Sequence, residues 1–152
     1  TNEYSMTAAS VCSPSNWILR EKIGQSIDSI HEPVPAYQTV LSQRVNRFLD
    51  GIRSGKIMLR YNWSVQPGNE LFWRDDLAPG HIEGNAAVQN LYWRIERQTF
   101  IRLPTSGAIV FGIRIFLHSF ASLRQTEGFE QAIAQLLARL PDAEKRYKGI
   151  DA

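Results

Sequence analysis

The stretch LYWRIERQTFIRLPTSGAIVFGIRIF, residues 91–116, decides the fold of this chain. Two runs of β-branched and aromatic residues flank the segment LPTSG, in which proline fixes φ and glycine permits a positive φ. Side chains alternate along each run, so that an apolar set and a charged set of the first run lie on opposite faces. The stretch therefore predicts one long β-hairpin.

Arginine and glutamate side chains in the first run carry the chemistry of this hairpin. Arg97 is in phase with the apolar set, whereas Arg94, Glu96 and Gln98 belong to the charged row. A buried arginine must be paired or bind an anion, because burying an unpaired charge is costly. A structural ion pair and a ligand-facing guanidinium both satisfy this requirement. Glu96 points away from Arg97 unless the strand bulges, so the pattern leaves open which face holds a site.

The rest of the chain predicts helices and strands around this hairpin. Apolar residues at intervals of three and four indicate helices, and strict alternation indicates strands. The expected elements are a strand at 6–12, a helix at 17–22, a helix at 37–52, a strand at 57–65, a helix at 129–140 and a helix at 142–147. Residues 66–90 form a long polar connection, either a binding loop or a surface insertion. This order predicts an α+β fold in which helices cover one face of an antiparallel sheet.

Composition limits the class of protein. A chain of 152 residues with 43% hydrophobic and 21% charged residues is expected to be one globular domain. The net charge of +2 is spread along the chain, so nucleic acid is not an expected partner. No apolar run is long enough to span a bilayer. The single cysteine, Cys12, cannot form an intrachain disulfide or a cysteine-rich zinc site and is predicted to be a small buried side chain.

Three histidines, His31, His81 and His118, are the remaining candidates for chemistry. Their spacing fits no metal-binding motif, and sequence signatures of serine hydrolases, P-loops and dinucleotide sites are absent. His31 precedes the segment EPVPA, which cannot continue a helix, so His31 is presented at the edge of a rigid loop. It is a loop histidine bonded to the backbone, an axial heme ligand or an acid–base group.

Four segments together resemble the heme-dependent oxidative N-demethylase family, of the heme-binding alpha-subunit type and its fungal relatives. They are PSNWILREKIGQSIDSIHEPVPAY, RYNWSV, WRIERQTFIRLPTSGAIVFGIRIF and YKGI. The similarity extends from about Thr7 to Ile150. Its most specific parts are the IHxPVP loop and the ERQTxxRLPxSGAIVFxIR hairpin.

The resemblance implies a PAS-like sheet that holds heme b noncovalently. It also implies O2-dependent oxidation of a small secondary amine such as dimethylamine, with electrons from a partner reductase that carries FMN and an iron–sulfur cluster. His31 would be the axial iron ligand, the metal-binding residue, held by the neighbouring prolines. Glu96 would orient the amine, and Arg97 would pair with a propionate or a bound oxygen species. Arg94 and Gln98 would complete the cofactor-binding set.

The family resemblance also carries an expectation about domain organisation. Family members have a further N-terminal portion, so residues 1–152 would form a single heme-binding PAS-like domain that is the C-terminal portion of a longer one. A second chain would then supply the missing portion. Two alternatives are a noncatalytic PAS-like heme-binding or sensing module and a structural subunit completed by a partner chain. An intracellular, soluble location is expected.

Overall fold

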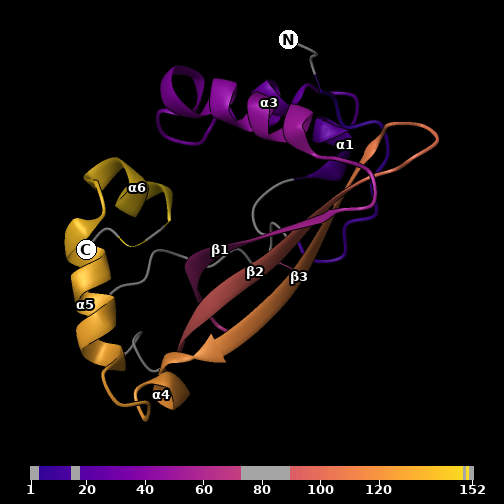
Figure 1. Ribbon diagram of the computed structural model, residues 1–152. Helices are drawn as coiled ribbons and strands as arrows, with labels where there is room; N and C mark the ends of the chain where they lie inside the picture. The colour runs from indigo at the N-terminus through magenta and orange to yellow at the C-terminus, as the bar shows by residue number, and fades with distance from the viewer. Residues whose placement is uncertain (1–3, 15–17, 73–89, 149, 151–152) are drawn as a thin grey trace.

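The computed structural model describes residues 4–14, 18–72, 90–148 and 150, and it has an α+β fold (Figure 1). A three-stranded antiparallel sheet has the order β1-β2-β3. The strands are β1 (Ile57–Pro67), β2 (Leu91–Arg102) and β3 (Ile109–Ser119). The helices are α1 (Leu19–Lys22), α2 (Ile27–Ile30), the π-helix η1 (Tyr37–Leu41), α3 (Ser42–Gly51), α4 (Phe120–Leu123), α5 (Phe129–Arg139) and α6 (Asp142–Tyr147). The predicted α+β class, antiparallel sheet and hairpin are confirmed.

The N-terminal part differs from the prediction. Residues 6–11 form no strand; Met6 exchanges backbone hydrogen bonds with Gly24 and Gln25, and the nearest ladder contact is the isolated bridge between Ser5 and Ser26. The small side chains of this segment offer little apolar surface to bury, and Cys12, predicted to be buried, is exposed. The expected helix at 17–22 begins at Leu19 in the structure, and its first predicted residue lies outside the described residues.

The register of β2 is continuous with both neighbouring strands. Glu96 lies opposite Asn62 on β1 and Ile115 on β3, and the following residue continues both ladders without a bulge. At the hairpin turn Gly107 has a φ of 72°, and the N–H of Leu103 donates to the carbonyl of Ala108 at 2.8 Å. Because the ladders are regular, Glu96 and Arg97 point to opposite faces of the sheet.

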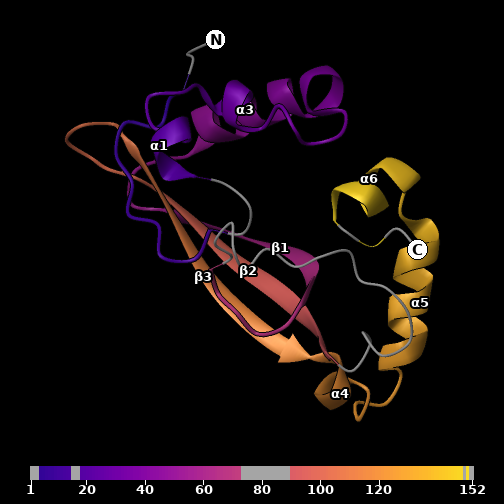
Figure 2. The same cartoon turned by 180° about the vertical axis from the view of Figure 1, so that it is seen from behind.

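The core lies at the hairpin end of the sheet, where α3 packs on β2 (Figure 2). Leu49 and Ile52 pack with Phe100, and Phe48 meets Phe100 edge-on with ring centroids 5.0 Å apart. Arg102 donates to the carbonyls of Leu49 at 2.7 Å and Ile52 at 2.6 Å. The carbonyl of Leu49 also accepts from the N–H of Ile52 at 3.2 Å, so Arg102 adds a second donor there and supplies a donor to the carbonyl of Ile52 just after α3.

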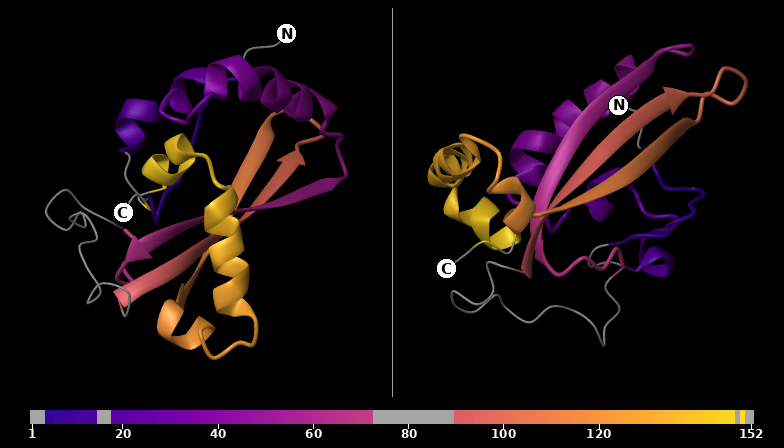
Figure 3. Two further views of the ribbon diagram at one scale, coloured as in Figure 1. Left: turned by 90° about the vertical axis from the view of Figure 1, so that its left-hand side faces the viewer. Right: turned by 90° about the horizontal axis from the view of Figure 1, so that it is seen from below.

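Helices α4 and α5 lie near the other end of the sheet (Figure 3), where each contributes a phenylalanine to an aromatic cluster. The ring of Trp93 lies 5.1 Å from that of Trp63, 6.1 Å from that of Phe120 and 5.9 Å from that of Phe129. Trp93 and Phe100 are an odd number of positions apart on β2, so their side chains leave opposite sides of the strand. Among the described residues no helix has the length and apolar character needed to cross a membrane.

Candidate functional site

One carboxylate fixes the short helix that precedes His31. Asp28 on α2 accepts hydrogen bonds from the hydroxyl of Tyr37 at 3.1 Å, the hydroxyl of Ser42 at 2.8 Å and the amide of Asn46 at 3.5 Å. These donors come from η1 and α3, elements up to 18 positions further along the chain. The carboxylate therefore ties α2 to the longer helix behind it, and it sets the place where the chain leaves α2.

His31 lies at that place, half-buried, directly after α2. Its Nδ1 atom is 2.8 Å from the carbonyl oxygen of Ile27, and its ring stacks on Tyr37 with centroids 5.0 Å apart and planes 12° from parallel. A carbonyl only accepts, so Nδ1 carries the hydrogen of this bond, and in the neutral ring Nε2 keeps a free lone pair. The ring is held in one orientation with one nitrogen available as a ligand.

Tyr37 makes the free energy of unfolding depend on pH in the alkaline range. Burial, the hydrogen bond to Asp28 and the negative charge of Asp28 raise the pKa of Tyr37 to about 12. Because the pKa in the folded state is above the ordinary value of 10.0, the stabilisation is complete below pH ~10 and is lost as the pH rises toward ~12. We expect the wild-type chain to lose about 2 kcal/mol of unfolding free energy across this interval that Tyr37→Phe does not lose.

The measurement is denaturant unfolding at several alkaline pH values, together with ultraviolet titration of tyrosine. Identical pH profiles for the wild type and Tyr37→Phe would show that the hydroxyl of Tyr37 does not interact with Asp28 as described.

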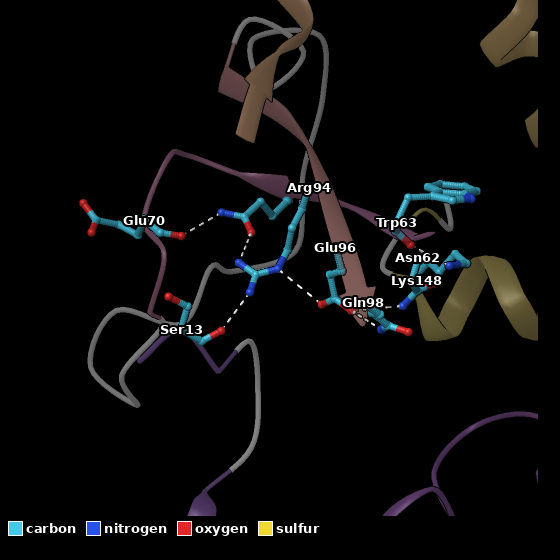
Figure 4. Close-up of polar contacts among 9 residues, drawn as sticks. Ser13, Asn62, Trp63, Glu70, Arg94, Glu96, Gln98 and Lys148 are labelled. Atoms are coloured by element: carbon cyan, nitrogen blue, oxygen red, sulfur yellow. Dashed lines mark hydrogen bonds and ion pairs between the residues drawn. The ribbon is translucent and has the colours of Figure 1, made fainter. Parts of the chain in front are cut away.

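A second polar cluster lies on the face of β2 for which the sequence predicts a row of charged residues (Figure 4). Arg94 is 1% exposed, and it donates from Nη1 to Oε1 of Gln66 at 3.3 Å and from Nη2 to the carbonyl of Ser13 at 2.8 Å. Gln66 in turn donates to the carbonyls of Gly68 at 3.1 Å and Glu70 at 2.9 Å. The guanidinium therefore joins β2, the end of β1 and the segment before α1.

The carboxylate of Glu96 shares this face. Its Oε1 atom is 3.7 Å from Nε of Arg94, and its Oε2 atom accepts from Gln98 at 2.9 Å and from Asn62 at 3.4 Å. Nε of Arg94 has no hydrogen-bond partner in the described parts of the chain, although it is buried. Burial lowers the pKa of the Arg94 guanidinium, and the charge of Glu96 partly opposes this effect. The carboxylate keeps 19% of its side chain exposed, so one edge stays accessible.

The C-terminal segment reaches the same neighbourhood. Nζ of Lys148 donates to the carbonyl of Trp63 at 2.7 Å and lies 4.4 Å from the centroid of the indole ring. Burial lowers the pKa of Lys148, and burial together with the charge of Glu96 raises the pKa of Tyr147. Residues at the end of α6 therefore respond to the carboxylate on β2.

The buried arginine of β2 is not the one expected from the sequence. Arg97 is only half-buried, and the fully buried guanidinium belongs to Arg94. The reason lies in two segments outside β2: the guanidinium of Arg94 donates to Gln66 at the end of β1 and to the carbonyl of Ser13 before α1. Periodicity within one strand cannot reveal which face a neighbouring strand or segment covers.

Arg97 lies on the other face in an unusual setting. It is directly opposite Arg114, and the two guanidinium carbons lie 6.0 and 5.2 Å from the centroid of the Phe116 ring. Within the described ranges neither arginine forms an ion pair, so the structural ion pair considered for Arg97 is not found there. Two like charges that face each other repel, and an anion between them would relieve that repulsion.

The structure thus brings some of the predicted site residues together and separates others. Arg94, Glu96 and Gln98 form one cluster, and Arg97 points to the opposite face. No hydrogen bond, ion pair or ring contact joins His31 to this cluster in the part of the chain that is described. His118 is exposed on β3 opposite Trp93, and His81 lies outside the described residues. No group of three or more His, Cys, Asp or Glu side chains suited to a metal occurs among the described residues.

Sequence reasoning missed the residues that support these positions. Ser13 and Gln66 bind Arg94, and Asp28 with Tyr37 fixes His31. Of these residues, only Asp28 could have been found from the sequence. Serine is a common N-cap residue, and Ser26 in that position places Asp28 in the first turn of α2. A surface pocket lined by residues 124–128, 130 and 131 lies at the α4–α5 connection and contains none of the predicted site residues.

The model of the family "Haem-dependent oxidative N-demethylase, alpha subunit-like" matches residues 1–152. The chain belongs to this family. The match to the haem-dependent oxidative N-demethylase family covers both the loop after α2 and the β2–β3 hairpin, the two most specific parts of the resemblance in the sequence.

Proposed function

We propose that this chain binds heme b noncovalently and takes part in the O2-dependent oxidative demethylation of a small secondary amine. A separate reductase carrying FMN and an iron–sulfur cluster would supply the electrons. We also propose that residues 1–152 form one PAS-like heme-binding domain. The observation that carries the proposal is the fixed ring of His31, with Nδ1 bound to a carbonyl and Nε2 available, in a chain of the haem-dependent oxidative N-demethylase family.

The residues around His31 fit an iron ligand. Histidines that bind metals almost always donate their second ring nitrogen to a carbonyl or carboxylate, which fixes the tautomer and makes the ligating nitrogen more basic. His31 makes this bond to Ile27, and the stacked ring of Tyr37 restricts its rotation. The heme would supply an iron centre that activates O2 for oxidation of the amine.

Two arginines fit the propionate groups of a heme. Arg97 and Arg114 face each other over Phe116 and form no ion pair among the described residues. Carboxylate groups are the anions that a guanidinium binds best, because two parallel N–H donors match their two oxygens. Arg97 keeps the anion-binding role expected from the sequence, and Arg114 would share it.

Glu96 fits the amine. The protonated amine carries N–H donors, and the carboxylate of Glu96 would accept from them on the face of the sheet opposite to that of Arg97. Gln98 and Asn62 orient Oε2, and Arg94 lies beside Oε1, so the carboxylate has one preferred position. Its exposed edge leaves room for a small cation to approach. Arg94 and Gln98 act here as positioning residues for the carboxylate.

The proposal is tested by turnover of the heme-loaded chain. With dimethylamine, O2 and an NADH-dependent reductase, we expect O2-dependent release of formaldehyde and methylamine, with two electrons and two protons consumed per methyl group removed. Glu96→Gln is expected to lower kcat/KM for the amine by about tenfold or more, because it removes the charge that holds the ammonium group.

Glu127→Gln is the matched control, since Glu127 is exposed on the connection between α4 and α5. A heme-loaded chain that consumes no O2 in response to amine would contradict the catalytic proposal and favour a heme-binding or sensing module.

A further inference from the structure

The backbone of β1 has an open outer edge. In a strand, the N–H and C=O groups of one residue point to the same edge, and the edge alternates from residue to residue. Lys148 donates to the carbonyl of Trp63, so the backbone groups of Trp63 point away from β2. Ile57, Leu59 and Tyr61 have the same parity. Just beyond the end of the ladder, the N–H of Gly68 donates to the carbonyl of Asn90, the residue before β2. This bond confirms that the backbone groups of even-numbered residues point toward β2.

These outward backbone groups have no partner within the described ranges. β1 pairs only with β2, and no further backbone hydrogen bond reaches residues 57, 59 or 61. The side chains at the same positions are exposed: Ile57 by 67%, Leu59 by 54% and Tyr61 by 62%. Sheets normally protect such an edge with charges, prolines or a covering segment, because it pairs readily with another strand. Lys148 provides that protection at Trp63, but among the described residues nothing provides it at residues 57–61.

The charged side chains along this edge are all positive. Residues 51–69 contain Arg53, Lys56 and Arg60 and no acidic residue. None of the three cations forms an ion pair in the part of the chain that is described. By alternation Lys56 and Arg60 flank the edge on the side opposite to that of Leu59. An antiparallel second copy centred on Leu59 would bring the two Arg60 side chains to diagonal positions on one face, where like charges repel.

We propose that the outer edge of β1 at residues 57–61 binds an extended segment of a partner protein in which apolar and acidic residues alternate. The segment would add a fourth strand next to β1. Its apolar side chains would lie against Ile57, Leu59 and Tyr61, and its acidic side chains would lie beside Lys56 and Arg60. Backbone hydrogen bonds give such strand addition its affinity, and alternate side chains give it specificity. This inference does not depend on heme binding.

Amide hydrogen exchange in the free chain tests whether the edge is open. The N–H groups of Leu59 and Tyr61 are expected to exchange rapidly, and those of Met58 and Arg60, which face β2, are expected to be protected. Protection of Leu59 and Tyr61 in the free chain would show that another part of the chain already pairs with this edge, and it would overturn the proposal.

Binding is tested with a fluorescent synthetic peptide of about nine residues that alternates valine and glutamate. We expect saturable binding that Leu59→Pro weakens by about tenfold, because proline removes an outward N–H without breaking the ladder to β2. Arg60→Glu is expected to weaken binding by a similar factor, and a peptide with lysine in place of glutamate is expected not to bind.

Ile113→Pro is the matched control. The N–H of Leu103 donates to the carbonyl of Ala108, so even-numbered residues of β3 face β2, and Ile113, which is 48% exposed, points its N–H outward from the opposite edge of the sheet. Circular dichroism is used to check that each variant is folded. If Leu59→Pro does not fold, Arg60→Glu still tests the proposal. The proposal is overturned by absence of peptide binding, by equal loss in Ile113→Pro, or by a dimer of the free chain that Arg60→Glu or Leu59→Pro dissociates.

Discussion

Replacement of Arg94 by alanine is expected to reduce the free energy of unfolding by about 3–5 kcal/mol. The substitution removes donors to Gln66 and to the carbonyl of Ser13, and it leaves Glu96 without its nearest cation. It also opens space where a side chain is 1% exposed. Denaturant unfolding followed by far-ultraviolet circular dichroism measures this loss.

Arg124→Ala is the control for this prediction. Arg124 also pairs with a carboxylate, that of Glu130, but the side chain of Arg124 is 58% exposed. Exposed pairs contribute only about 0–1 kcal/mol, so this variant is expected to unfold nearly as the wild type does. A loss in Arg94→Ala no larger than the loss in Arg124→Ala would contradict the structural role of Arg94.

A double variant separates the hydrogen bonds of Arg94 from its packing and from the charge of Glu96. In Arg94→Met/Glu96→Gln the long side chain is kept in part and both charges of the pair are removed. We expect this variant to be more stable than Arg94→Ala, because no uncompensated carboxylate remains next to the buried space. Stability equal to that of Arg94→Ala would mean that the lost hydrogen bonds to Gln66 and Ser13, rather than the unpaired carboxylate or the lost volume, cause the effect.

Removal of His31 is expected to weaken heme binding by about 100-fold or more, because the loss of a ligand exceeds the typical effect of losing its hydrogen-bonded support. Titration of heme into the purified apoprotein, followed by absorbance, measures the affinity. Added imidazole is expected to restore part of the spectrum in His31→Ala, because the free base can occupy the space of the missing ring. His118→Ala, at an exposed position of β3, is expected to bind heme as the wild type does.

Local patterns were sufficient to predict the sheet and the longer helices. The alternation and the turn residues of 91–116 predict the hairpin, and the apolar spacing that follows Pro35 predicts the region of η1 and α3. The prediction was wrong at residues 6–12, where small side chains alternate without enough apolar surface to form a strand. Short segments of this kind take their structure from the neighbours they bond to, here Gln25 and Gly24.

The candidate site could be predicted only in part, because its contacts are long-range. The orientation of His31 depends on the carbonyl of Ile27, four positions earlier. A helical turn brings residues at this spacing together, so this contact can be expected from the local sequence. The burial of Arg94 depends on Ser13, 81 positions away, and on Gln66, 28 positions away. The sequence of β2 alone does not show that Arg94, rather than Arg97, is the buried arginine. Only the folded chain, which brings Ser13 and Gln66 to Arg94, shows this.

The iron–histidine bond itself is the most direct test of the proposed role of His31. Resonance Raman spectra of the ferrous, heme-loaded chain report the stretching vibration of that bond. We predict one heme per chain and an iron–histidine band that is present in the wild type and in His118→Ala and absent in His31→Ala. An unchanged band in His31→Ala, or a wild-type chain that binds no heme, would contradict it.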